Sequence, residues 1–155
     1  MINLLACFLV SFIVGVTPTT IKFTDIFRGI RADVRLLGCH DGDSVTVQLD
    51  NYCCGKSFII NARIDGINAP ELKDEGGYEA RDALLNFLTS QDTEGWSKKQ
   101  VSAYLAETTH KIKAEFLKLD KYGRPLIKIF KNNDLLSDMM IRGGFAKPYL
   151  GKTRQ

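Results

Sequence analysis

Residues 44–49 read SVTVQL, in which polar and apolar side chains alternate. An alternation with a period of two predicts a β-strand with one buried face. A strand is also expected over residues 32–37, joined to the first by the turn CHDGD, and another over residues 57–67 (SFIINARIDGI), which Pro70 ends. The folded part of the chain is therefore expected to begin with three strands.

Two helices are expected next. The first opens at Gly76-Gly77, and its apolar face repeats at helical spacing as Ala80, Leu84, Phe87 and Leu88, with Glu79, Arg81 and Asp82 outside. The second begins at a capping box formed by Ser97 and Gln100. Its apolar face consists of Val101, Tyr104, Leu105 and Thr108, and we interpret this helix as an insertion.

Alternation returns in residues 111–118, where Ile112, Ala114 and Phe116 share one side. A turn at residues 122–125 leads into a strand over residues 126–130. A last helix is expected from residue 135 to about 142, capped by Asp134 and stopped by Gly143-Gly144. Five short antiparallel strands with a helix between the third and fourth predict an α+β, mainly β fold: a five-stranded OB-fold Greek-key barrel with two to three helices.

The composition fits one globular domain, with 155 residues of which 45% are hydrophobic and 25% charged. The net charge of +3 is spread unevenly. Residues 1–110 carry 10 Lys and Arg against 14 Asp and Glu, whereas residues 111–155 carry 11 against 4. Such a split is compatible with one face for a cation and another for a polyanion, although from charge alone we favour simple mixing in space.

The N-terminus carries an uncharged apolar run, residues 4–16 (LLACFLVSFIVGV), whose length suits a signal peptide better than a membrane span. No Lys or Arg precedes it. Within residues 1–21 a signal peptide is our first expectation, an uncleaved anchor the second and a buried element the third. The protein is then secreted or membrane-anchored, with its domain in residues 22–155. The four cysteines match no zinc spacing and are expected to be buried thiols.

Three charged stretches each have an ordinary structural interpretation. DGDS, at residues 41–44, reads as an acidic hairpin turn, and no Glu stands twelve positions on to complete an EF-hand. RIDGINAPE, at residues 63–71, places Arg63, Asp65 and Ile67 on one face of a strand, where Arg63 and Asp65 could form a surface ion pair. DKYGR, at residues 120–124, reads as a hairpin turn.

Together with RGGFAKPY at residues 142–149, these stretches resemble the staphylococcal-nuclease-like (thermonuclease) family in order and spacing. The resemblance covers roughly residues 32–149 and implies an OB barrel with helices. It also implies a calcium-dependent phosphodiesterase that cuts DNA and/or RNA with little sequence specificity. The partners it implies are nucleic acids alone; the protein is expected to be a monomer, and to meet a membrane only if the N-terminal segment is uncleaved.

The resemblance assigns roles by position. It implies one Ca²⁺ held by the Asp43 carboxylate, the Asn68 side chain and the Ala69 backbone carbonyl. Arg63 and Arg124 would bind the scissile phosphate, and Glu71 would orient or deprotonate the attacking water. The nucleotide-binding residues would be Lys121, Tyr122 and Tyr149.

These residue types suit the chemistry, because a phosphodiester repels hydroxide until positive charge surrounds its oxygens. Arginine offers permanently charged, bidentate donors, and a hard cation prefers oxygen ligands. A carboxylate beside the water can take its proton. Asn68 departs from the family, which usually has Asp there, so we expect weakened calcium binding. Asp65 is a conceivable but not expected substitute.

Two other functions are compatible with the sequence. One is a nucleic-acid-binding OB module without catalysis, although Arg63, Glu71 and Arg124 are all retained. The other is a secreted or anchored β-barrel that binds a protein or a sugar, which gives no reason for two arginines and an acid in these motifs. We rank them after the nuclease, in that order.

Overall fold

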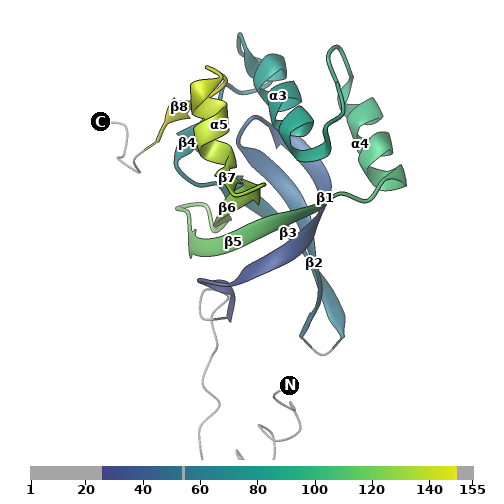
Figure 1. The fold of residues 1–155 in the computed structure, drawn as a ribbon, viewed down its shortest axis with the longest axis vertical. Helices are drawn as coiled ribbons and strands as arrows, with labels where there is room; N and C mark the ends of the chain where they lie inside the picture. Colours follow the sequence, from purple (N-terminus) through teal and green to yellow (C-terminus); the bar gives the residue numbers. More distant parts are fainter. Residues whose placement is uncertain (1–25, 54, 150–155) are drawn as a thin grey trace, which may run out of the picture.

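The computed structural model describes residues 26–53 and 55–149, which form a closed five-stranded mixed β-barrel with three helices (Figure 1). The barrel strands are β1 (Arg31–Asp41), β2 (Ser44–Cys53), β3 (Lys56–Ile64), β5 (Lys111–Leu119) and β6 (Pro125–Lys131). The helices are α3 (Gly77–Thr89), α4 (Lys98–Glu107) and α5 (Leu136–Arg142). Short strands are β4 (Ile67–Asn68), β7 (Asp134–Leu135) and β8 (Lys147–Pro148). The predicted OB-fold barrel is confirmed.

One parallel pairing closes the barrel. The strand order is β3-β2-β1-β5-β6, with antiparallel neighbours throughout, and β3 then pairs with β6 in parallel. In that pairing Arg63 lies opposite Leu126, and Ile64 lies opposite Ile127. Because side chains alternate between the two faces of a strand, Arg63 and Leu126 both point away from the core.

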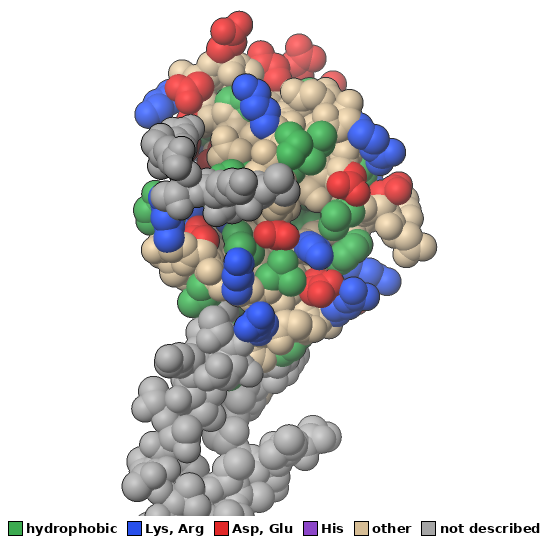
Figure 2. Space-filling model, turned by 90° about the vertical axis from the view of Figure 1, so that its left-hand side faces the viewer, with side chains coloured by type: hydrophobic (Ala, Val, Ile, Leu, Met, Phe, Trp, Pro, Cys, Tyr) green, Lys and Arg blue, Asp and Glu red, His purple; other side chains and the backbone are tan. Residues whose placement is uncertain are grey.

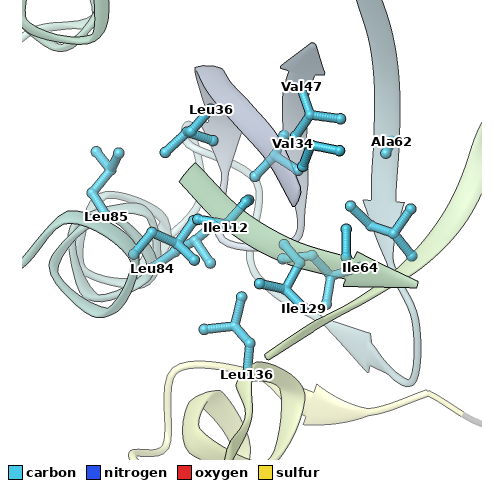
Figure 3. Packing of buried hydrophobic residues seen from close by; sticks show 14 of the residues in the cluster. Val34, Leu36, Val47, Ala62, Ile64, Leu84, Leu85, Ile112, Ile129 and Leu136 are labelled. Atoms are coloured by element: carbon cyan, nitrogen blue, oxygen red, sulfur yellow. The ribbon is translucent and has the colours of Figure 1, made fainter. Parts of the chain in front are cut away.

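The core fills the barrel and continues under the helices. The alternation predicted for β2 is present, since Val45, Val47 and Leu49 are buried. Leu84 of α3 and Leu136 of α5 point toward the barrel side chains of Ile112 and Ile129 (Figure 3), and Leu85 belongs to the same buried cluster. Each fully buried Leu or Ile contributes about 1.5–3 kcal/mol, so the helices are held chiefly by this shared core.

Helix α4 begins as the sequence predicts. The Ser97 side chain accepts a hydrogen bond from the Gln100 backbone N–H, and the Gln100 side chain accepts one from the Ser97 N–H. Val101 and Leu105 are buried, while Tyr104 packs edge-on against Trp96 at 5.5 Å between ring centroids. Helices α3 and α4 both pack against β1.

The continuous strand predicted over residues 57–67 is wrong. Strand β3 ends at Ile64, and a turn at Asp65-Gly66 separates it from β4. Gly66 has φ +83, a left-handed conformation that an unbroken strand does not contain. Arg63, Asp65 and Ile67 therefore do not share one face of a single strand.

Two further expectations fail in the helices. Arg81 was expected on the outer face of α3, but it is fully buried: its guanidinium donates to Asp82 Oδ1 and, across a loop, to the Trp96 carbonyl at 2.8 Å. Asp134 does not cap α5, because it pairs with Lys131 in the β6–β7 ladder, and Leu135 precedes the helix without a side-chain cap. Both outcomes depend on contacts that local spacing does not show.

Among the helices of residues 26–149 that the structure describes, none is long and apolar enough to span a membrane. The expectations for residues 1–21 fall outside the described part of the chain, as do those for Cys7 and Cys54 and for the Cys53 side chain. Cys39 is a free, half-buried thiol that donates to the Asp41 carbonyl at 3.3 Å.

Candidate active site

Asp43 is the centre of the site. Asp43 is 3% exposed and lies in the turn between β1 and β2. Its Oδ1 accepts hydrogen bonds from Arg63 Nη1 at 2.8 Å and from Ser44 Oγ at 3.0 Å. Its Oδ2 accepts the Ala69 backbone N–H at 2.9 Å. One carboxylate thus joins the β1–β2 turn, the end of β3 and the segment after β4.

Asn68 and Asp43 both accept hydrogen bonds from the Arg63 guanidinium. Arg63 Nη2 donates to Asn68 Oδ1 at 3.0 Å and to the Ile67 carbonyl at 3.3 Å. The two side chains predicted to bind a cation therefore converge on one positive group. The surface ion pair between Arg63 and Asp65 is absent among the described residues; the carboxylate partner of Arg63 is Asp43.

The Asp43 carboxyl lies in a costly environment for a charge. Burial raises the pKa of the Asp43 carboxyl above its ordinary value, and the Ala69 N–H and the Arg63 charge offset this only in part. The ionised carboxylate would therefore be stabilised by additional positive charge close to it.

Two glycines allow the backbone to approach this closely. A Cβ on Gly42 would lie 2.7 Å from the Cβ atoms of both Ala69 and Ala80. A Cβ on Gly77, at the start of α3, would lie 2.0 Å from the Glu71 carbonyl oxygen. These glycines set how the Asp43 turn and the Glu71 loop pack against α3.

The second arginine is held at the start of β6. Asp120 Oδ2 accepts from Arg124 Nε at 2.9 Å, while Oδ1 accepts the backbone N–H groups of Tyr122 and Arg124 at 2.8 and 2.9 Å. Burial would raise the pKa of Asp120, but these hydrogen bonds and the Arg124 charge outweigh it and lower the pKa. The Tyr122 ring, 72% exposed, lies 4.9 Å from Lys121 Nζ and 5.5 Å from Arg124 Cζ.

The pairing of β3 with β6 brings the two arginines to one end of the barrel. Arg63 lies beside Leu126. Arg124 comes two residues before Leu126, so the alternation of side chains places both on the outer face of the barrel. Tyr149 joins them from the C-terminal side. Its N–H donates to the Gly66 carbonyl at 2.8 Å beyond the β4–β8 pairing, and its ring centroid lies 5.8 Å from Arg63 Cζ.

Glu71 is near in sequence but not joined to this network. It is exposed, and its carboxylate has no hydrogen bond or ion pair among the residues that the structure describes. Its backbone carbonyl accepts the Asp74 N–H at 2.8 Å, which fixes the loop. The Glu71 side chain is therefore free to reorient.

The three groups predicted to hold a cation supply oxygen donors only. The Asp43 and Asn68 oxygens already surround a positive charge, and the Ala69 carbonyl accepts no hydrogen bond within the described range. Calcium prefers such oxygens, usually six to eight of them. Asp43 supplies the only carboxylate among these three groups, and the described residues contain no cluster of three or more His, Cys, Asp or Glu side chains able to hold a metal.

Sequence reasoning missed Asp120 as the anchor of Arg124, as well as the packing role of Gly42 and Gly77. The signal for Asp120 was its place at the head of a turn, where Asp commonly accepts backbone N–H groups. Asp41 does the same for the Asp43 N–H at 3.2 Å. The glycines carried no distinct signal, because their neighbours are distant in sequence.

No family model matches the chain, and the search of curated proteins gave no match either.

Proposed function

We propose that this protein is a nuclease that hydrolyses phosphodiester bonds of DNA and/or RNA with the help of calcium. The observation that carries the proposal is the convergence of the Asp43 and Asn68 oxygens on the Arg63 guanidinium, at 2.8 and 3.0 Å. Oxygens that now hold the Arg63 guanidinium could hold a metal cation in its place, which supports the proposal.

Arg63 and Arg124 would bind the non-bridging oxygens of the scissile phosphate. Arg63 would leave Asp43 for the phosphate, because a guanidinium binds two phosphate oxygens at once in bidentate geometry. Arg124 is oriented by Asp120 through its Nε, and its two terminal nitrogens have no hydrogen-bond partner within the described chain. They are therefore available to the substrate.

Asp43, Asn68 and the Ala69 carbonyl would hold the cation that replaces Arg63. When bound, calcium would supply positive charge beside the phosphate and lower the pKa of a bound water. Glu71 would accept the proton of the attacking water as the new P–O bond forms and the bond to the leaving oxygen breaks. Lys121, Tyr122 and Tyr149 would contact the terminal phosphate and the nucleotide.

A nucleic-acid-binding module without catalysis is the second candidate. It is favoured by the ion pair that already neutralises Asp43 with Arg63. Among the described residues, Glu71 also forms no hydrogen bond or ion pair with that pair. Such a site could bind phosphate without activating water.

The test is cleavage of an end-labelled single strand and of duplex DNA by the full chain, in calcium and in excess chelator. The proposal predicts shorter products in calcium alone. Intact substrate in calcium, together with measurable binding, would support the second candidate and overturn the nuclease.

A further inference from the structure

A group of basic side chains lies on the outer face of the barrel. The outward positions of β1, β5 and β6 carry five cations and two acids. The cations are Arg31, Arg35, Lys111, Lys113 and Lys128, and the acids are Asp33 and Glu115. Figure 2 shows the left-hand side of the view in Figure 1, where Lys and Arg side chains are interspersed with acidic and hydrophobic ones.

Strand pairing places these groups in two neighbouring rows, Lys128–Glu115–Arg31 and Phe130–Lys113–Asp33. We name Lys128, Phe130, Lys113 and Arg31 together the β6 track. Phe130 lies opposite Lys113, and Lys128 lies opposite Glu115. Glu115 is already neutralised by Arg31 at 2.9 Å. Asp33 lies opposite Lys113 in the β1–β5 ladder, but neither Lys113 nor Lys128 forms an ion pair within the described residues.

An aromatic ring and a pocket accompany the charge. The Arg31 guanidinium lies 5.7 Å from the Phe130 ring centroid. Both residues line an open pocket of about 530 Å³, together with Asp33, Lys113 and Asn133. Pockets of roughly 300–1,000 Å³ accept small ligands, and a nucleobase is flat enough to contact a ring or a guanidinium plane.

The track continues directly from the candidate active site. From Arg124, just before β6, the outward positions run through Leu126, which is beside Arg63, to Lys128 and Phe130. At about 3.3 Å per residue, the six steps from Arg124 to Phe130 span roughly 20 Å. OB folds hold single strands over about 4–16 nucleotides, so one strand can cover both the candidate active site and the β6 track.

We propose that the β6 track binds the same single-stranded nucleic acid several nucleotides away from the bond that is cut. The inference rests on the proposed function for its substrate class. Lys113 and Lys128 contact the phosphates, and the pocket beside Phe130 receives a base. A duplex hides its bases in the stack, so the track favours single strands.

The test is fluorescence anisotropy of labelled oligothymidylates with the full chain in excess chelator, where no cutting interferes. The expected result is tighter binding of a 12-mer than of a 3-mer. The double variant Lys113→Gln/Lys128→Gln should weaken 12-mer binding roughly tenfold or more and reduce the slope of log K against log salt by about 1.4, since each lost contact removes about 0.7. Phe130→Leu should weaken binding of the single strand more than binding of a duplex of equal charge.

The matched control is Lys98→Gln/Lys99→Gln in the first turn of α4, which removes the same charge from another exposed surface. Equal loss of 12-mer affinity in the two double variants would overturn the proposed binding by the β6 track. Equal affinity of the protein for the 3-mer and the 12-mer would overturn it as well. Cleavage in calcium is scored separately on the same proteins. Track binding without cleavage would refute the nuclease alone, whereas cleavage without a length effect would refute the track alone.

Discussion

Arg63 Nη1 lies 2.8 Å from Asp43 Oδ1, joining two residues that are 20 positions apart in the chain. The Arg63 side chain is 16% exposed and that of Asp43 is 4% exposed, so the pair is shielded from water. A shielded charge pair is costly to break unless each partner gains a replacement. A cation for Asp43 and a phosphate for Arg63 would be such replacements.

Asn68→Asp should strengthen calcium binding, because a full negative charge replaces an amide oxygen that now faces Arg63. We expect the calcium concentration that half-saturates the rise in melting temperature to fall about tenfold, equivalent to about 1.4 kcal/mol. Asn86→Asp on the exposed side of α3 is the control. An unchanged calcium dependence would show that Asn68 is not a ligand.

Asp120→Asn should reduce stability in a pH-dependent way. The pKa of Asp120 is lowered in the folded protein, so its contribution is present above the unfolded value of 3.8 and is lost as the pH falls through the folded value. We expect the variant to lose about 1 kcal/mol at pH 7 and progressively less below pH 4. Urea unfolding across this range measures the difference. A difference in unfolding free energy between the wild type and the variant that stays constant down to pH 3 would contradict the role assigned to these hydrogen bonds.

Gly77→Ala should displace the loop that carries Glu71. The new Cβ would sit 2.0 Å from the Glu71 carbonyl oxygen, a backbone atom that cannot swing aside. A loss of at least about 2 kcal/mol in unfolding free energy is expected. Gly38→Ala is the control, since its nearest contact would be an ordinary 3.4 Å to Thr46. Similar stabilities for the two variants would refute the close approach.

Arg81→Ala should destabilise the protein by about 3 kcal/mol, because it leaves Asp82 and the Trp96 carbonyl without their buried donor. Arg81→Met should lose less, since it keeps the packing volume and removes Nη1, which is buried without a partner. Lys99→Ala, exposed on α4, should change little. Denaturant unfolding of the three variants ranks their free energies of unfolding. A Met variant less stable than the Ala variant would contradict this prediction.

The order of strands and helices was predictable because alternation and caps are local signals. SVTVQL showed its buried face directly, and Ser97 with Gln100 marked the start of α4 to the residue. The broken strand was not predictable from β-forming residues alone, because only Gly66 marked the turn, and a lone glycine also occurs within strands. The burial of Arg81 depends on a carbonyl 15 residues away.

The candidate site was predictable only as a set of residues. Motif order singled out Asp43, Arg63 and Asn68, and the structure brings these three into one hydrogen-bonded cluster. Their mutual pairing was not foreseen, since Asp65 is nearer to Arg63 in sequence. The parallel pairing that sets Arg63 beside Leu126 is a contact between distant strands, which no periodicity reveals.

The most direct test of the central claim is the single-turnover rate at which the full chain cuts a single-stranded DNA in saturating calcium, compared with Glu71→Gln. Glu75→Gln, an exposed acid four residues on, is the control. The account predicts cutting by the wild type and the control, and a loss of about 10²-fold or more in Glu71→Gln, as expected for a missing general base. Equal rates for Glu71→Gln and the wild type, or no cutting by any of the three, would contradict it.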